Sequence, residues 1–480
     1  MLNFIFFLII FILFFSVSCS LNYIRISYFF LFSFCFLYLL ILLFFFNKSI
    51  FFYQLVFDFL SISFFNIYFS FGIDILSILL VFLSNFSLIF CLFIYWYLRY
   101  KISFYLILLF ISSILFFNVF FSIDFFSFHI SFEAIVIPMF LLIGIWGSRE
   151  RKIYASYQLF LYTLLGSILL LFCFSSFYLN KGSIFFDFIL YSLFFQYREF
   201  LLWIFLFIGF AVKIPIIPLH IWLPEAHVEA PTPGSVILAG ILLKLGTYAM
   251  FRFLVTFFSN ILEELIFFIF NIALLSMIYS SLVALNQIDI KKIVAYSSIS
   301  HMNFALFGIF REIILGLTGA FFIMLAHAIT SSFLFLGIGV LYERYKTRLI
   351  FYFGGLVNFM PIFASLYFFG IISNFGFPGT FNFISEFLIL CGAFTFSHSI
   401  ILISSIGIFS ASVYSLFFLN KIFFGLIPNF FIRFYSDCNR FEFLILINFI
   451  CLILFFGIFP NFLINYIIIF LLKIDNSYLF

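Results

Sequence analysis

Charged residues are scarce in this chain. Only 8% of its 480 residues are Asp, Glu, Lys or Arg, whereas 67% are hydrophobic. A water-soluble domain needs a far more polar surface, so the composition excludes one and indicates an all-α membrane protein. The net charge of +4 is small and spread along the chain, which argues against a nucleic-acid-binding face.

Patterns that bind metals, nucleotides or haem are also lacking. The seven cysteines form no C-x-x-C pair, and the sequence has no glycine-rich nucleotide loop. The histidines stand singly rather than in the facing pairs that hold haem between two helices. We therefore expect no metal site, no cofactor-binding residue and no redox centre in this chain.

Apolar runs of membrane-spanning length fill most of the sequence and predict about fourteen transmembrane helices. They cover residues 3–19, 26–46, 73–98, 103–123, 125–146, 153–179, 200–223, 235–257, 261–285, 293–310, 315–341, 356–397, 399–423 and 443–470.

The distribution of Lys and Arg tests this topology. Loops after even-numbered spans, before the C-terminal tail, carry five basic residues, and loops after odd-numbered spans carry fourteen. By the positive-inside rule, the odd loops face the side of synthesis. The fourteen are Arg25, Arg99, Lys101, Arg149, Arg151, Lys152, Lys291, Lys292, Arg344, Lys346, Arg348, Lys421, Arg433 and Arg440.

Two spans, the seventh and the twelfth, contain helix-breaking residues. The seventh reads AVKIPIIPLHIWLPEAH and the twelfth reads SNFGFPGTFNFISEF. Broken helices at membrane depth usually line a polar cavity. The two spans lie five apart, and each carries a charge, Lys213 and Glu386. This arrangement predicts two inverted five-helix repeats.

The repeats divide the chain into four predicted parts. The first three helices cover residues 1–102, and the C-terminal helix covers 426–480. Between them lie the first repeat at 103–257, with helices 4–8, and the second repeat at 258–425, with helices 9–13.

Ionisable residues inside these spans are the candidate functional residues, because a charge in hydrocarbon must be paired, hydrated or neutralised. A lysine whose carboxylate partner moves can change its protonation state near pH 7, and imidazole titrates in the same range. We expect a proton relay, although charges that only pack helices together would give a similar pattern. The candidates are Glu133, Lys213, Lys244, Glu386, His301, His327, His220 and His227.

At these residues the sequence resembles a known family. The run AVKIPIIPLHIWLPEAHVEAPTPGSVILAGILLKLGTYAM, together with FEAIVIPMFLLIGIWG, DIKKIVAYSSISHMNF and MLAHAITSSFLFL, is similar to the antiporter-like subunits of respiratory NADH:quinone oxidoreductase (complex I). The same family includes Mrp-type sodium/proton antiporter subunits and membrane subunits of related hydrogenases. The resemblance covers residues 70–430.

The resemblance implies roles for individual residues. Glu133 and Lys213 would be the family's glutamate–lysine pair on helices five and seven, and Lys244 its central lysine on helix eight. His301 and His327 would be polar linkers. Members similar to mitochondrial subunits 2 and 5 carry a lysine on helix twelve, whereas a third mitochondrial branch carries a glutamate there. Glu386 predicts that this chain is closest to the third branch.

The resemblance also implies a setting. The chain would relay protons in the membrane arm of complex I, next to neighbouring antiporter-like subunits and lipid, while NADH, FMN, iron–sulfur clusters and ubiquinone are handled by partner subunits. The 94 phenylalanines fit a thymine-rich gene, and no presequence precedes the first apolar run. We therefore expect an organelle-encoded protein of the mitochondrial inner membrane.

Two other functions stay open at this point. The same residues would serve a subunit of a sodium/proton antiporter of the Mrp type, which works without NADH oxidation. A quinone-binding role is also conceivable, but the sequence shows no distinctive quinone pocket.

Overall fold

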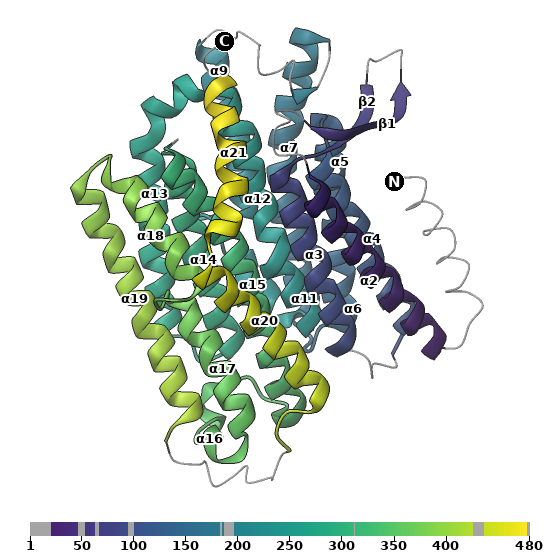
Figure 1. The fold of residues 1–480 in the computed structure, drawn as a ribbon, viewed down its shortest axis with the longest axis vertical. Helices are drawn as coiled ribbons and strands as arrows, with labels where there is room; N and C mark the ends of the chain where they lie inside the picture. Colours follow the sequence, from purple (N-terminus) through teal and green to yellow (C-terminus); the bar gives the residue numbers. More distant parts are fainter. Residues whose placement is uncertain are drawn as a thin grey trace.

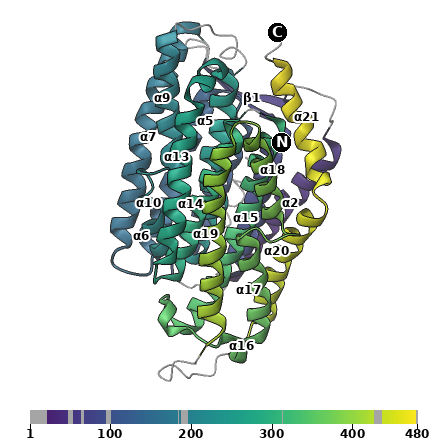
Figure 2. The ribbon, with the colours of Figure 1, turned by 90° about the vertical axis from the view of Figure 1, so that its left-hand side faces the viewer.

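A computed structural model describes residues 21–46, 53–62, 67–94, 100–182, 185–186, 196–311, 313–425 and 436–477. The protein is a bundle whose helices run along its long axis (Figures 1 and 2). The first half contains α2 (Leu21–Phe45), β1 (Gln54–Ile62), β2 (Ile67–Ile73), α3 (Ile75–Ile94), α4 (Ile102–Phe121), α5 (Phe125–Ala134), α6 (Val136–Trp146), α7 (Lys152–Lys181), α9 (Gln196–Lys213), α10 (Trp222–Glu229), α11 (Thr232–Ile237), η2 (Leu238–Leu242), α12 (Leu243–Ala249) and η3 (Met250–Val255).

The regular elements described in the second half are all helices. It contains α13 (Ser259–Leu285), α14 (Ile290–Ile309), α15 (Ile314–Tyr345), η4 (Ile350–Tyr352), α16 (Leu356–Phe359), α17 (Pro361–Asn374), α18 (Phe381–Phe394), α19 (His398–Phe423), α20 (Arg440–Ile458) and α21 (Asn461–Ser477).

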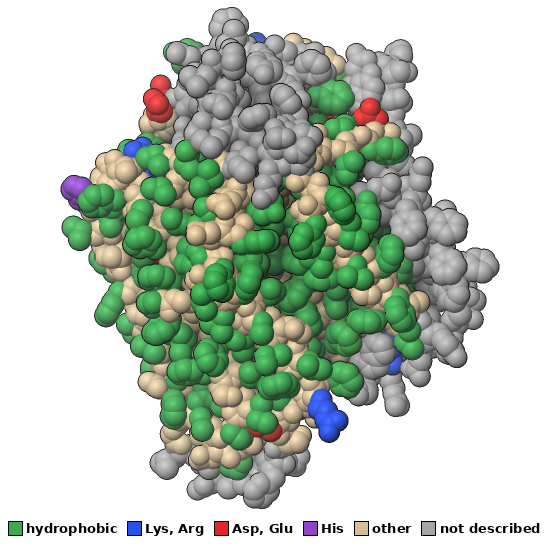
Figure 3. Space-filling view, in the orientation of Figure 1, with side chains coloured by type: hydrophobic (Ala, Val, Ile, Leu, Met, Phe, Trp, Pro, Cys, Tyr) green, Lys and Arg blue, Asp and Glu red, His purple; other side chains and the backbone are tan. Residues whose placement is uncertain are grey.

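The predicted spans correspond to these helices. The first span, residues 3–19, lies outside the described residues. Each of the other thirteen coincides with one helix or with consecutive helical segments, four in span eight (α11, η2, α12 and η3) and three in span twelve (α16, α17 and α18). Within the described residues, ten helices are long and apolar enough to cross a membrane. Hydrophobic side chains cover the middle of the visible face, and charged ones lie toward its ends (Figure 3). The predicted all-α membrane bundle is confirmed.

The interruptions predicted in spans seven and twelve are also present. Helix α9 ends at Lys213 and α10 begins only at Trp222, with Pro215 and Pro218 between them. Because proline has no N–H and disturbs the preceding turn, backbone carbonyls at the break need other hydrogen-bond donors. The Trp222 indole N–H is one such donor and bonds to Val212 O at 2.9 Å. The second break separates α17 from α18.

Three departures from regular helices were not predicted. Span five is divided into α5 and α6 at Ile135, because Pro138 cannot donate a hydrogen bond to the carbonyl of Ala134. Pro460 divides span fourteen into α20 and α21. In span eight, the π-helical segments η2 and η3 lie on either side of α12. A π-helical turn often marks a functional site.

A two-stranded antiparallel hairpin, β1–β2, precedes α3 and was not predicted either. It lies at one end of the bundle (Figure 1). Its inner strand is tied to the start of α5, where Asp124 accepts hydrogen bonds from the backbone and hydroxyl of Ser70 at 2.8 and 2.5 Å. These hydrogen bonds fix strand β2 against the start of α5.

Loops rich in basic residues are joined at the opposite end. Ser148 N–H donates to Glu229 O, Ile290 N–H donates to Arg348 O, and Gly355 N–H donates to Phe424 O. These bonds link the connections that follow spans five, seven, nine, eleven and thirteen, so these odd-numbered loops lie at the same end of the bundle. Arg344 adds a paired contact to Glu442, at 2.6 Å between Nη2 and Oε2.

The most enclosed helices are the eighth and eleventh spans. Each of the ranges Thr232–Val255 and Ile314–Tyr345 contains a stretch of 18 residues that is entirely buried, whereas only 17% of the most apolar 18 residues of α2 are buried. Polar residues on these two central helices are therefore surrounded by protein rather than by lipid, which makes a charge there tolerable.

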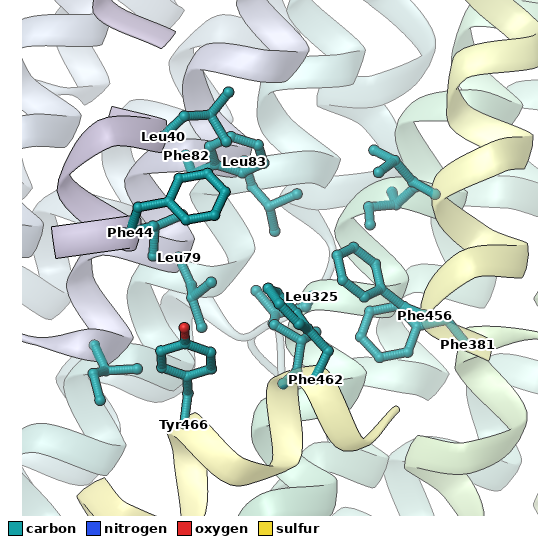
Figure 4. Close-up of a pocket in the computed structure, with 15 residues that line it drawn as sticks. Leu40, Phe44, Leu79, Phe82, Leu83, Leu325, Phe381, Phe456, Phe462 and Tyr466 are labelled. Carbon is teal, nitrogen blue, oxygen red and sulfur yellow. The ribbon is translucent and has the colours of Figure 1, made fainter. Parts of the chain in front are cut away.

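An apolar cavity of about 160 Å³ lies between α2, α3, α15, α18, α20 and α21. Leu, Ile, Phe and Tyr side chains line it, among them Leu325, Phe381 and Tyr466 (Figure 4). An apolar cavity of this kind does not hold the water that conducts protons. A proton path has to run through a different part of the bundle.

Candidate functional site

Glu133 and Lys213 form the first charged pair. Glu133 lies on α5, two residues before the break at Ile135, and Lys213 is the last residue of α9. Lys213 Nζ lies 3.6 Å from Glu133 Oε1. The lysine is 2% exposed and the carboxylate side chain 24%. This is an ion pair inside the bundle, with its acidic member partly open to the surroundings.

Lys213 has two further contacts that hold it in place. Its ammonium donates a hydrogen bond to Phe132 O at 2.6 Å, and it lies 3.2 Å from the centroid of the Phe132 ring. A cation at the C-terminal end of a helix is also favoured by the helix dipole, and a cation over an aromatic face is attracted by its quadrupole. The lysine can therefore keep a defined position when its pairing with Glu133 changes.

Lys244 is the central charge, on the fully buried eighth span. Its Nζ donates to Ala239 O at 2.5 Å and lies 2.8 Å from His327 Nδ1. Ala239 belongs to the π-helical segment η2. Because an ammonium group only donates hydrogen bonds, His327 Nδ1 is the acceptor when the lysine is charged.

The chain of polar groups continues from His327 to Glu386. The ring centroids of His327 and His301 are 5.5 Å apart. His301 Nδ1 then lies 3.5 Å from Glu386 Oε1. Lys244, His327, His301 and Glu386, which come from four different helices (α12, α15, α14 and α18), thus form one series, in which Lys244 contacts His327 directly and the two further steps are longer. All four residues are at most 7% exposed.

The second helix break positions Glu386. Gly376, in the turn between α17 and α18, has φ +70°, and a Cβ atom at this position would lie 2.4 Å from Glu386 Oε2. Only glycine satisfies both the left-handed backbone and this close approach. The break therefore brings the turn against the carboxylate at the end of the series.

The end of α9, which carries Lys213, packs against α12, which carries Lys244. A Cβ atom on Gly246 would lie 2.7 Å from the side chain of Ile214, the residue after Lys213. The end of α9 thus packs on α12 one half-turn from Lys244. A change in pairing at Lys213 therefore changes the electrostatic potential at Lys244, and it can also displace α12 through this packing contact.

The two other predicted histidines lie in different surroundings. His220 faces the rings of Tyr279 and Tyr296, at centroid distances of 5.7 and 6.5 Å, and is not brought to the Lys244–Glu386 series by any contact among the described residues. His227 is fully buried, and its ring stacks on Phe335 with centroids 4.8 Å apart. In the part of the chain that the structure describes, no three His, Cys, Asp or Glu residues are grouped so as to hold a metal ion.

Comparison with known proteins places this arrangement in a family. Residues 122–412 match the family model described as NADH:quinone oxidoreductase/Mrp antiporter, TM. The NADH-ubiquinone oxidoreductase chain 4 of Chondrus crispus is 45% identical over 410 residues, which is 85% of this chain and 83% of that protein. The chain belongs to this family.

Chains of two solved complexes share the fold. A chain of respiratory complex I from Thermus thermophilus superposes with a TM-score of 0.86 and 26% identity, covering 94% of this chain and 95% of that one. A chain of the Mrp complex from Dietzia sp. DQ12-45-1b gives a TM-score of 0.83 and 17% identity, covering 94% and 92%. The second likeness concerns the fold alone.

The family assignment confirms the resemblance predicted from the motifs. The Chondrus crispus relative is a chain 4, which is the third mitochondrial branch that Glu386 indicated. The roles assigned to individual residues stay predictions, which the geometry makes testable.

Buried charges that the sequence analysis did not single out lie at both ends of the bundle. Arg252 forms an ion pair with Asp74, and its guanidinium is also bonded to the hydroxyl of Tyr248. At the other end, Lys291 and Arg348 are 3% and 2% exposed, although the sequence analysis treated them as loop charges. Their position next to predicted spans made them indistinguishable from solvated residues in sequence.

Replacing Glu133 by glutamine is expected to slow proton translocation by about tenfold or more. The change keeps the shape of the side chain but removes the charge 3.6 Å from Lys213 Nζ, and an opposite charge at this range alters a proton affinity by at least about tenfold. Translocation is measured as acidification or alkalinisation in liposomes that contain the intact assembly. Glu150→Gln, at an exposed loop carboxylate, is the control. Unchanged translocation in Glu133→Gln would show that the pair only packs helices.

Proposed function

We propose that this chain is a proton-translocating subunit in the membrane arm of a respiratory NADH:ubiquinone oxidoreductase, the counterpart of chain 4 in its relatives. The observation that carries the proposal is the buried series Lys244–His327–His301–Glu386, which comes from four helices. Lys244 Nζ lies 2.8 Å from His327 Nδ1, the rings of His327 and His301 are 5.5 Å apart between centroids, and His301 Nδ1 lies 3.5 Å from Glu386 Oε1. Positioned groups of this kind pass protons when water fills the remaining gaps.

In the proposed mechanism, the Glu133–Lys213 pair acts as the switch. When Lys213 changes its pairing with Glu133, the electrostatic potential at Lys244 changes, and a proton moves along the histidines to or from Glu386. Moving one charge across 100 mV requires about 2.3 kcal/mol, and a change of about 1.7 pKa units corresponds to a similar free energy. A buried ion pair can supply a change of this size.

The energy for this switch would come from partner subunits. We propose that NADH, FMN, iron–sulfur clusters and ubiquinone are bound by other subunits of the assembly. The immediate partners of this chain would be neighbouring antiporter-like membrane subunits and lipid. We also propose that the chain is organelle-encoded and resides in the mitochondrial inner membrane. The 45% identity to a chain 4 supports this setting.

We also propose that residues 103–257 and 258–425 are two inverted repeats. The break after Lys213 and the break before Glu386 would then occupy equivalent positions. Such paired breaks place the polar groups of both repeats at the middle of the membrane.

Purification through a tag on this chain tests the proposed assembly. We expect it to co-purify with bound flavin and iron–sulfur clusters, seen by absorbance and electron paramagnetic resonance, and with NADH:ubiquinone reductase activity. Membranes that express the untagged chain serve as the control. Isolation with sodium/proton exchange activity and without NADH oxidation would instead support the Mrp-type function, for which the likeness in fold is the present argument.

A further inference from the structure

A buried ion pair joins span eight to α3 at the end of the bundle that carries the β1–β2 hairpin (Figure 1). Arg252, in the π-helical segment η3, pairs through Nη2 with Oδ2 of Asp74, and the two side chains are 12% and 9% exposed. The same nitrogen lies 3.2 Å from the hydroxyl oxygen of Tyr248, one turn earlier on span eight. Two charges are seldom buried together without a structural or functional reason, and no step of the proposed relay uses this pair.

Both partners of Arg252 are themselves fixed to neighbouring helices. Asp74 Oδ1 accepts a hydrogen bond from the backbone N–H of Ser77 at 2.9 Å, and the Ser77 hydroxyl donates to Asp74 O at 2.8 Å. The hydroxyl of Tyr248 donates to Phe120 O, at the end of α4, at 3.0 Å. Arg252 is therefore held by one group at the start of α3 and by a second group that is bonded to α4.

Span eight needs such a tie because it is not a regular α-helix. Lys244 stands on α12, a segment of seven residues between the π-helical segments η2 and η3. The i→i+5 hydrogen bonds of a π-helical turn are rare, and a change to i→i+4 bonds in η3 would turn α12 about its axis relative to the rest of the span. Contacts made by the two π-helical segments must therefore fix the rotation of α12.

The two π-helical segments are held in different ways. At η2, the Lys244 ammonium donates to Ala239 O, and this bond is made within span eight itself. At η3, the Arg252 guanidinium bonds to Asp74, which belongs to a different part of the bundle. The second bond, unlike the first, fixes the rotation of span eight relative to its neighbours.

The contact between Lys244 and His327 depends on this rotation. The lysine Nζ lies 2.8 Å from the histidine Nδ1. Successive residues of an α-helix are about 100° apart around its axis, so a rotation by a fraction of one residue would carry the ammonium beyond hydrogen-bond range. His327 stands on α15, which is one continuous α-helix of 32 residues. The rotation of span eight therefore decides whether the two groups meet.

We propose that Arg252 is a positioning residue for the proton relay. Its ion pair with Asp74 fixes the rotation of the segment that carries Lys244 and thereby holds the lysine ammonium in contact with His327. This inference rests on the proposed function and adds to it a residue that lies eight positions beyond Lys244 in the sequence. An ion pair that only stabilised the bundle would leave proton transfer unaffected once the chain is assembled.

The test is Arg252→Met in the intact assembly reconstituted in liposomes, with proton translocation expressed per assembled chain. We expect the rate to fall about tenfold or more, because a small misplacement of a reacting group costs at least this factor. Arg252→Lys, which keeps a positive charge next to Asp74, should retain most of the rate. Translocation by Arg252→Met at the unmodified rate would overturn the proposal.

Arg344→Met is the matched control. Arg344, in the last turn of α15, pairs with Glu442 at 2.6 Å, and the two side chains are 9% and 14% exposed. The substitution removes a comparably buried ion pair from the helix that carries His327. Because α15 is continuous, we expect a rate close to that of the unmodified assembly. An equal loss in Arg344→Met and Arg252→Met would attribute the effect to stability and would overturn the proposal.

Further measurements separate the possible failures. If Arg252→Met is not incorporated into the assembly, Asp74→Asn is used, which removes the charge from the same pair and keeps the shape of the side chain. The same loss is expected, and an unmodified rate would again overturn the proposal. Cryo-electron microscopy of the variant that assembles should show Lys244 Nζ beyond about 3.5 Å from His327 Nδ1; an unchanged contact would reject the positioning role. Normal translocation by Lys244→Met would reject the proposed function, whereas its loss in Lys244→Met but not in Arg252→Met would reject the positioning role alone.

Discussion

Lys244→Met is expected to reduce proton translocation by about a hundredfold or more. Methionine has nearly the same length, so it fills the buried volume while removing the ammonium group that contacts both Ala239 O and His327 Nδ1. Loss of a positioned acid–base group typically slows proton transfer by about 10²–10⁴-fold. The rate is measured in liposomes that contain the intact assembly, together with the amount of assembled chain.

The control for this experiment is a lysine outside the buried series. Lys421 lies at the end of α19, is exposed and contacts the ring of Phe417. Lys421→Met therefore removes the same charge without touching the buried series, and we expect a normal rate. Intact assembly with normal translocation in Lys244→Met would support a chain whose charges only pack helices, and it would reject the relay.

Gly376→Ala is expected to reduce translocation by about tenfold or more, although residue 376 itself carries no ionisable group. Its Cβ atom would lie 2.4 Å from Glu386 Oε2, a distance at which the carboxylate must move. Glu386 would then leave its position 3.5 Å from His301 Nδ1, and the last transfer in the series would lose its hydrogen-bond geometry. The measurement is again translocation by the intact assembly in liposomes.

Gly379 provides the matched control in the same turn. It also has a positive φ, +92°, but a Cβ atom there would meet no atom of the described residues within 4 Å. Gly379→Ala shares the backbone strain of about 1–3 kcal/mol without displacing Glu386. Equal loss of activity in both variants would attribute the effect to the backbone. Partial recovery in Gly376→Ala with Glu386→Asp, whose carboxylate is shorter, would attribute it to the clash.

Much of the candidate site could be predicted from sequence, because an ionisable residue inside a membrane-spanning apolar run is rare and easily identified. Lys244 stands in the run VILAGILLKLGTYAM, and Lys213 precedes two prolines. In a soluble protein a lysine at such a position would be one surface residue among many, but in an apolar span it requires a partner. The family motifs then indicated which charges belong together.

Other features of the site could not be predicted from such sequence patterns. His220 and His227 lie seven residues apart on one connection and look equivalent in sequence, yet the ring of His220 faces Tyr279 and Tyr296 whereas the ring of His227 stacks on Phe335. Arg348 has the sequence context of a loop residue but is buried against α10. These differences arise from how the chain packs after the helices form.

The sequence by itself therefore determined that the protein is a helical membrane bundle, where thirteen of its spans lie, that the seventh and twelfth are broken, and which charges stand within apolar runs. These properties follow from local composition, because the cost of exposing a polar group to lipid is paid residue by residue. Only the tertiary structure decided that Lys244, His327, His301 and Glu386 form one series, and that Glu229 and Arg348 are buried beside each other. Such distances depend on the rotation and packing of helices from distant parts of the chain, which no local pattern encodes.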